Sequence, residues 1–387
     1  MEYKEYELGE LLYYEQPTPY IVESTDYNDA YETPVLTAGK SFILGYTDEK
    51  EGIYDQLPVI IFDDFTTASQ YVNFKFKVKS SAMKILTPVT ELVLPKYIYY
   101  RIQIIQFDHS THKRYWIQQY SKIRVSIPPI PEQECIVARI EELFSQLDAG
   151  VETLKKTKAQ LAVYRQAVLK EAFEGRLTAS GPEKIVRLGD YIETPRYGTS
   201  KKCSYDDGRD RTAVYRIPNI EHKNGRISHD DIKYAQFTES ELDGIRLQQG
   251  DILIIRSNGS VSLVGRAAMV CDADITGTFA GYLMRLRISE PETLLPKFLL
   301  LFLQSHQARI YIENKAKSTS GVHNINSTEI SDLQMPLYDP DTQYAIIEAI
   351  ESRLSVCDSI EQTVDTALQQ AEAMRQSILK DVFEGRL

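Results

Sequence analysis

The chain has 387 residues, of which 43% are hydrophobic and 26% charged, and it carries a net charge of −11. The length allows two or three domains, and the acidic balance argues against a protein that binds polyanions over its whole surface. Residues 1–12 contain no apolar run, and no stretch of about 18 apolar residues occurs, so we expect neither a signal peptide nor a transmembrane helix. The cysteines are widely separated, which disfavours zinc or disulfide frameworks and favours a reduced, cytoplasmic setting: Cys135, Cys203, Cys271 and Cys357.

Residues 1–126 are predicted to form a mixed globular domain with more strand than helix. Residues 59–62 are a short apolar run, and residues 71–78 alternate, with Lys75 and Lys77 on one side, which is typical of a half-buried strand. Residues 95–106 fit a short helix or a strand, and the spacing of their apolar side chains favours the helix.

Residues 127–177 are predicted to form one long helix. Its apolar residues recur every seven positions, which indicates a coiled-coil seam: Ile140, Leu147, Leu154, Leu161 and Val168. Prolines stand before the helix, where they are tolerated, and Gly175 suits the left-handed position just beyond its end. We expect Leu154 to be buried in the seam.

Residues 178–337 are predicted to form a second globular domain with the same mixture of elements. Residues 252–255 follow a turn as a buried strand, residues 281–288 alternate as another strand, and residues 296–307 favour a helix. This segment has no net charge and holds nearly half of the lysines and arginines, whereas the acidity of the chain is greatest in residues 338–387. A local basic surface is therefore possible in the second domain.

The second long helix, in residues 338–387, repeats the first one 210 positions later. Residues 378–387 match residues 168–177, and the match continues upstream without a gap to Gln133 and Gln343. The globular segments share short fragments as well, at residues 8–10 and 188–190 and at residues 95–97 and 296–298. The chain is thus predicted to be duplicated, with two related but different globular domains carried on two similar helices. Such a design suits the recognition of two different targets at a fixed separation.

Motifs for catalysis are absent from the sequence. Residues 37–41 resemble the end of a phosphate-binding loop, but Pro34 occupies the position of its first glycine, so we expect an ordinary turn at Gly39. No glycine-rich dinucleotide loop, zinc-protease motif or nucleophile elbow occurs. The acidic pairs at residues 63–64 and 206–207 are interpreted as solvated surface rather than as metal ligands. We therefore predict no catalytic residue, no cofactor and no metal.

The ends of both long helices carry the sequence Phe-Glu-Gly-Arg-Leu, at residues 173–177 and 383–387, and residues 127–133 read Ile-Pro-Pro-Ile-Pro-Glu-Gln. These motifs resemble the central and C-terminal repeats of the specificity (S) subunits of type I restriction-modification systems. The resemblance covers the whole chain, and its helical part is the specific part. The second entrance, at residues 335–343, keeps the glutamine but departs from Pro-Glu-Gln.

The resemblance implies an α+β fold in which residues 1–126 and 178–337 are target recognition domains, each for one half of a bipartite DNA site. The helices of residues 127–177 and 338–387 would pair as an antiparallel coiled coil in a pseudo-two-fold internal duplication. Two methyltransferase (M) subunits and two restriction nuclease-translocase (R) subunits would join a non-catalytic chain in host defence. The M subunits would hold S-adenosylmethionine, and the assembly would act as a DNA adenine methyltransferase and an ATP-dependent deoxyribonuclease.

Two polar loops of the second domain are the candidate DNA contacts. Arg256 and Asn258 follow a buried strand and offer an arginine for guanine and an asparagine for adenine. The loop of residues 315–324 is basic and glycine-containing, and it contributes Lys317, Ser320, Gly321, His323 and Asn324. Either loop could instead be an ordinary strand connection. Arg196 and Lys201 are weaker candidates for phosphate contacts, with surface solvation as the alternative.

In the first domain the candidates occupy mirrored positions. They are Lys40 beside Gly39, then Thr66, Thr67 and Ser69 after the apolar strand, and finally Lys113 and Arg114 in the segment that mirrors the Lys317 loop. Trp116 is expected in the core rather than as a platform for stacked bases. A structural adaptor with two protein-binding heads is the main alternative from another class, and a self-sufficient nuclease or methyltransferase is disfavoured by the missing motifs.

Overall fold

The computed structural model describes residues 3–39, 41–105, 115–177, 181–208, 210–221, 223–319 and 321–387, without the side chains of residues 317–319. The chain divides into two compact units, one made of Met1–Lys155 with Asp365–Leu387 and the other of Lys156–Val364. We describe each unit by itself. Among the described residues, no helix combines the length and the apolar character needed to cross a membrane.

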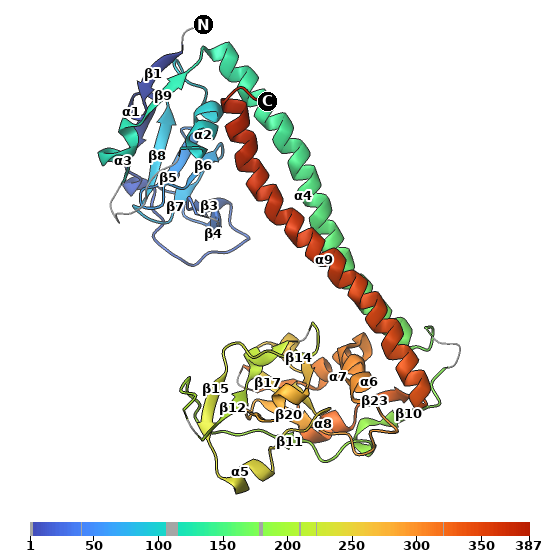
Figure 1. Ribbon diagram of the computed structural model, residues 1–387. Helices are drawn as coiled ribbons and strands as arrows, with labels where there is room; N and C mark the ends of the chain where they lie inside the picture. The colour runs from blue at the N-terminus through green and yellow to red at the C-terminus, as the bar shows by residue number, and fades with distance from the viewer. Residues whose placement is uncertain are drawn as a thin grey trace. The chain divides into compact units, whose positions relative to one another are not determined.

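The first unit contains a globular part, head 1, which extends from β1 to β9 (Figure 1). Its main sheet has the order β2 (Leu12–Glu15), β8 (Met83–Pro88), β5 (Val59–Asp63) and β6 (Ser69–Val72). A second sheet has the order β4 (Ile43–Thr47), β3 (Thr33–Leu36) and β7 (Lys77–Val78), with β3 and β7 parallel. The remaining strands and α-helices described in this head are β1 (Lys4–Glu7), β9 (Arg124–Ile127), α1 (Leu8–Leu11), α2 (Pro95–Gln103) and α3 (Tyr115–Gln118).

The strand at residues 59–62, the helix after residue 95 and the core position of Trp116 were predicted correctly. The single strand predicted for residues 71–78 was wrong, because β6 ends at Val72 and β7 belongs to the other sheet. The alternation failed because Lys77 lies inside the domain. Its side chain is only 5% exposed, and its ammonium group lies 2.6 Å from the carboxylate of Glu49, whereas Lys75 is exposed.

The second unit contains head 2, which extends from β10 to β23. Its main sheet has the order β11 (Arg196–Tyr197), β20 (Leu283–Leu286), β16 (Ile252–Ile255) and β18 (Ala267–Met269). A second sheet has the order β15 (Lys233–Gln236), β12 (Arg211–Tyr215) and β19 (Thr278–Phe279), with β12 and β19 parallel. The helices are α5 (Glu239–Asp243), α6 (Pro296–Gln304), α7 (His306–Lys315) and α8 (Ser327–Ser331).

Two further pairs and one small sheet complete head 2. β10 (Lys184–Arg187) pairs with β23 (Gln334–Leu337), as β1 pairs with β9 in head 1. β13 (Ile220–Glu221) and β14 (Arg226–Ile227) form a hairpin. The small sheet has the order β17 (Ser257–Asn258), β22 (Val322–Asn324) and β21 (Lys317–Thr319). The buried strand at residues 252–255 and the helix after residue 296 agree with the sequence predictions.

The two heads can be compared position by position through their backbone hydrogen bonds. The amide of Asp64 donates to Ala82, and the carbonyl of Asp64 accepts from Tyr115. In head 2 the amide of Arg256 donates to Tyr282, and its carbonyl accepts from Ile325. Since β5 and β16 hold the same place in their sheets, Asp64 and Arg256 occupy corresponding positions.

The long helices α4 (Ile130–Phe173) and α9 (Pro340–Phe383) have 44 residues each and begin and end at positions 210 apart. Gly175 and Gly385, with φ of 74° and 70°, follow their ends in the left-handed conformation that the sequence predicted. Each unit contains part of both helices. In the first unit Ile140 and Phe144 pack with Ile378, Leu379 and Val382. In the second, Arg165 pairs with Asp358 at 2.6 Å.

The heptad residues differ in burial along the two helices. Ile140, Val168 and the heptad positions of α9 from Ile350 to Ile378 are buried. Leu154 in α4 is only half-buried, as are the neighbouring heptad leucines. The expectation of full burial at Leu154 is therefore wrong, and its truncation should cost less than that of a core residue.

A buried glutamine fastens the beginning of each long helix to its head. The side chain of Gln133 accepts a hydrogen bond from the amide of Leu94 (2.8 Å) and donates to the carbonyls of Leu92 (3.1 Å) and Pro128 (2.8 Å). Gln343 makes the corresponding three bonds, to the amide of Leu295 (2.9 Å) and to the carbonyls of Thr293 (2.8 Å) and Tyr338 (2.7 Å). Leu94 and Leu295 precede α2 and α6, so each glutamine joins two helix entrances.

Candidate nucleic-acid interface

The two polar loops predicted separately in head 2 meet in one small sheet. Asn258 of β17 pairs with His323 of β22. The other edge of β22 pairs with β21. Gly321, with φ of 79°, allows the tight turn between β21 and β22. The His323 ring lies with Nδ1 3.1 Å from the carbonyl oxygen of Ala316. Because a carbonyl only accepts, this nitrogen carries the proton, and the ring is held in a fixed orientation.

Arg256 stands where the small sheet meets the main sheet. Its Nη1 donates to the carbonyl of Gly281 at 3.1 Å, and its guanidinium lies 4.4 Å from the centre of the Tyr197 ring. The hydroxyl of Tyr197 accepts in turn from the amide of Ser327 at 3.0 Å. The ring and the carbonyl together hold the guanidinium in one orientation, which arginine needs for a specific planar contact.

Arg256 also lines a cavity of about 580 Å³ on head 2, which we call the basic cavity. Four of its lining side chains are basic and come from separate segments of the head: Lys201, Arg216, Lys233 and Arg256. Tyr282, which is 63% exposed, contributes an aromatic face to the same lining. Basic side chains beside an accessible aromatic ring are the combination with which proteins bind nucleic-acid phosphates and bases.

Acidic residues outside the lining orient two of these cations. Lys201 pairs with Glu241 at 2.7 Å, and the pKa of Glu241 falls to about 2, mainly because it accepts the hydrogen bond of Lys201. Arg216 pairs with Asp231 at 2.9 Å, and Tyr205 and Arg216 lower the pKa of Asp231 by hydrogen bonding. The cavity therefore holds oriented cations whose charge is already partly balanced.

The remaining predicted residues of head 2 are placed as follows. Arg196 is exposed on β11, next to Tyr197, and Lys201 lines the basic cavity. Asn258 accepts from the amide of Ser260 at 2.8 Å through its own side chain, as in a tight polar turn. Asn324 is half-buried in β22. Ser320 and the side chain of Lys317 lie outside the described residues.

The predicted residues of head 1 are dispersed. Thr66 and Thr67 form the turn between β5 and β6, where Asp63 accepts from the amide of Thr66 at 3.0 Å and Thr67 has a φ of 57°. Ser69 is buried and accepts from Gln103 of α2 at 2.6 Å, so its expected availability to DNA is not supported. Lys40, Lys113 and Arg114 lie outside the described residues.

The acidic pair at residues 63–64 corrects another expectation. Asp64 was predicted as solvated surface, but it is 2% exposed and accepts from the amide of Trp116 at 2.8 Å. The ammonium group of Lys84, which is completely buried, lies 3.8 Å from its carboxylate. The error arose because a buried partner from a distant strand cannot be seen in a local pattern. Asp206 and Asp207 are exposed, as expected.

Residues that the sequence did not reveal complete the basic cavity. Arg216, Lys233 and Tyr282 come from the loop after β12, from β15 and from the turn before β20, and no local motif marks them. The glutamines in the first turn of each long helix did leave a signal in the sequence. Gln133 and Gln343 were visible as a repeat, but their hydrogen bonds were not.

No family model matches the chain. Among curated proteins it is 47% identical over 174 residues to the EcoR124I/EcoR124II type I restriction enzyme specificity subunit of Escherichia coli, covering 42% of this chain and 43% of that protein. It is 29% identical over 277 residues to the EcoKI specificity subunit of E. coli K12, and the match covers 69% of this chain and 58% of that protein. The chain thus spans about half the length of the curated relatives it matches.

Solved structures share its fold. A chain from a study of the assembly and conformational transition of the type I R-M system has a TM-score of 0.70 at 16% identity, covering 100% of this chain and 98% of that one. The HsdS subunit of Thermoanaerobacter tengcongensis has a TM-score of 0.50 at 16% identity, covering 100% and 97%. The fold is that of HsdS subunits. The comparisons confirm the resemblance to type I restriction enzyme specificity subunits.

Proposed function

We propose that this chain is the DNA-recognition subunit of a type I restriction-modification complex, in which each head reads one half of a bipartite site. The proposed domains are residues 1–126 and 178–337 for recognition and residues 127–177 and 338–387 for the spacer. The observation that carries the proposal is the basic cavity of head 2, beside the sheet that joins both predicted loops. In this arrangement Arg256 would contact a base edge, and Lys201 and Arg216 would contact phosphates.

The spacer is proposed to be an antiparallel coiled coil formed by α4 and α9 in an internally duplicated chain. Two ion pairs related by the repeat support it, since Arg165 and Asp358 pair in the second unit and Arg375 and Asp148 pair in the first. Lys96 with Glu141 and Lys297 with Glu351 form a second such set between head and helix. A paired helical spacer would keep two half-sites in rotational register on the duplex, where one turn is about 34 Å.

The chemistry is assigned to partners. We propose that two M subunits supply S-adenosylmethionine binding and adenine methylation, and that two R subunits supply ATP-dependent translocation and cleavage in cytoplasmic host defence. The chain itself would have no catalytic role. Its near-neutral second domain agrees with a DNA affinity that depends on these partners, because phosphate contacts dominate affinity and scale with the positive charge presented.

The test is a map of methylated bases across the genome of a host that expresses the chain with its cognate M subunit. We expect a two-part motif with a constant gap, which disappears when the chain is omitted. Variants of the basic cavity should alter one part of the motif only. An assembled complex that produces no new motif would contradict the proposal.

A further inference from the structure

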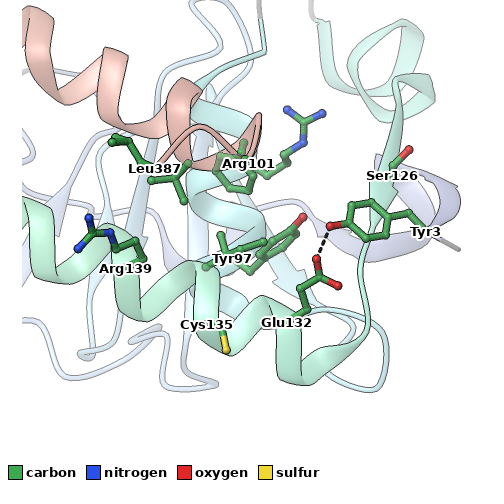
Figure 2. A pocket seen from close by; sticks show the side chains of 12 residues that line it. Tyr3, Tyr97, Arg101, Ser126, Glu132, Cys135, Arg139 and Leu387 are labelled. Carbon is green, nitrogen blue, oxygen red and sulfur yellow. Dashed lines mark hydrogen bonds between the residues drawn. The ribbon is translucent and has the colours of Figure 1, made fainter. Parts of the chain in front are cut away.

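A second cavity, of about 440 Å³, lies in the first unit, where the end of α9 meets α2 and the start of α4 (Figure 2). We call it the helix-end pocket. Its aromatic and apolar lining includes Tyr97, Ile136, Val382, Phe383 and Leu387. Its volume exceeds the roughly 150 Å³ that suffices to hold a benzene ring. The polar side chains around it include Tyr3, whose hydroxyl donates to Glu132, as the dashed line in Figure 2 shows.

The second unit shows what fills the corresponding place. There Tyr338, only 1% exposed, packs its ring 5.9 Å from the ring of Phe298 and donates its hydroxyl to the carbonyl of Phe173 at 3.4 Å. The hydroxyl also lies 3.6 Å from the position that a Cβ atom at Gly175 would occupy. These three neighbours correspond through the repeat to Tyr97, Phe383 and Gly385, all of which line the helix-end pocket.

Pro128 occupies the position of Tyr338 in the first unit. The correspondence is fixed by the glutamine bonds, because Gln133 donates to the carbonyl of Pro128 and Gln343 donates to the carbonyl of Tyr338. The same interval in the sequence is where the second helix entrance departs from the first. Proline has no side chain that could reach the space that the Tyr338 ring fills, and the helix-end pocket therefore stays open.

The charged residues at the edge of the pocket indicate which chemical group a bound aromatic ligand would carry beside its ring. Arg101 replaces the buried Phe302 of the second unit, and its guanidinium lies 5.5 Å from the centre of the Phe383 ring. Within the described residues Arg101 forms no ion pair, whereas Glu132 is engaged by Tyr3. Arg139, half-exposed and paired with Glu142, adds a second cation to the lining. Arginines at the edge of an aromatic pocket suit a ligand in which an aromatic side chain stands next to an acidic residue, because the guanidinium groups can pair with its carboxylate.

We propose that the helix-end pocket binds a tyrosine side chain that a partner protein presents next to an acidic residue. The tyrosine ring packs against Tyr97, beside the contact between the Tyr97 and Phe383 rings, as Tyr338 packs against Phe298 in the second unit. Its hydroxyl donates to the carbonyl of Phe383, as the hydroxyl of Tyr338 donates to the carbonyl of Phe173. The acidic neighbour contacts Arg101. The site is separate from the basic cavity, and the proposal does not depend on DNA recognition.

The experiment uses the full chain and two probes, p-cresol and the acetylated and amidated tetrapeptide Leu-Tyr-Asp-Pro, which copies residues 337–340. Cys135 lines the pocket and is exposed, and Cys271 is an exposed cysteine of head 2 that serves as the internal control. We expect the probes to slow the alkylation of Cys135 by iodoacetamide severalfold and to leave Cys271 unchanged, as measured by peptide mass spectrometry. Equal effects on both cysteines, or none on Cys135 up to the solubility limit of the peptide, would overturn the proposal.

Substitutions refine the test. Pro128→Tyr should fill the pocket from within and abolish protection by both probes, with circular dichroism as the control for folding. A peptide with phenylalanine in place of tyrosine should bind roughly 2- to 10-fold more weakly, because it lacks one hydrogen bond. Arg101→Glu should weaken the tetrapeptide but not p-cresol, and Arg124→Glu, outside the pocket, is its matched control. Protection that persists in a folded Pro128→Tyr chain would place the probes elsewhere and overturn the assignment.

Discussion

Head 1 and head 2 use the same strand order and the same backbone hydrogen bonds around one central position, but they place opposite charges there. In head 1 this position is Asp64, buried with Lys84 beneath Trp116. In head 2 it is Arg256, which opens onto the basic cavity. A second position also differs between the heads, but there a neutral residue replaces a cation. The amide of Lys79 donates to Leu36 at the end of β3, and the amide of Ala280 donates to Tyr215 at the end of β12. The next residue is Thr37 in head 1 and Arg216 in head 2.

The difference teaches that the strand order and the proposed recognition surface are encoded by different residues. Strand order depends on apolar residues, and the helix entrances share two glutamines whose hydrogen bonds are alike in both halves. The charge at the end of the central strand differs in sign without a change of frame, because Lys84 pairs with Asp64 in head 1, whereas the Gly281 carbonyl and the Tyr197 ring hold Arg256 in head 2.

The largest effect should come from the buried pair of head 1. Lys84→Met leaves Asp64 without its ammonium partner inside the domain, and we expect it to lower the free energy of unfolding by about 3–5 kcal/mol. Chemical denaturation followed by circular dichroism measures the change. Because head 2 has Met284 in β20 without such a pair, the double variant Lys84→Met with Asp64→Asn should recover part of the loss. A double variant no more stable than the single one would show that the pair is not a unit.

Substitution of Gln133 and substitution of Gln343 should lower the free energy of unfolding by similar amounts. Gln133→Met or Gln343→Met removes three hydrogen bonds and leaves buried backbone groups unpaired, for a cost of about 2–4 kcal/mol in either case. Hydrogen exchange of the amides of Leu94 and Leu295 locates the damage in the expected half. A clear inequality between the two variants would mean that the helix entrances are not equivalent.

Arg256→Ala should affect recognition by head 2 alone. The loss of a planar arginine contact is expected to cost about 1–3 kcal/mol of discrimination in one half-site and nothing in the other. Binding of the assembled complex to duplexes altered in either half-site measures it. Arg353→Ala is the control, because this half-exposed arginine pairs with Glu171 away from the cavity. Equal losses of discrimination in both half-sites would contradict the assignment of Arg256 to one half-site.

The smallest expected effect is the loss of the stabilising contribution of Glu241 at low pH. The pKa of Glu241 is lowered to about 2 by Lys201, so its contribution to stability is complete above its ordinary value of about 4.3 and is lost as the pH falls towards 2. The exposed position of the pair keeps the effect slight. Carbon-detected NMR of the Glu241 carboxyl group should show it ionised at pH values where exposed glutamates are already protonated. Lys201→Ala should bring the titration back to the ordinary range.

Much of the frame was accessible from the sequence, whereas the site was accessible only in part. The seven-residue spacing, the entrance prolines and Gly175 predicted both long helices, because these signals are local. The two loops of head 2 were recognised as polar, but their pairing through Asn258 and His323 depends on strands far apart in the chain. The burial of Asp64 was missed for the same reason, since its partner Lys84 lies in β8.

The division of the chain has a consequence for its synthesis. The second unit is a continuous stretch, Lys156–Val364, and its contacts can form as soon as that stretch has left the ribosome. The first unit is discontinuous, because it needs Asp365–Leu387 to complete the packing of Ile140 and Phe144. Domains usually fold in the order of their synthesis, N-terminal first. Here the order is reversed, and we expect the part that is made first to be finished last.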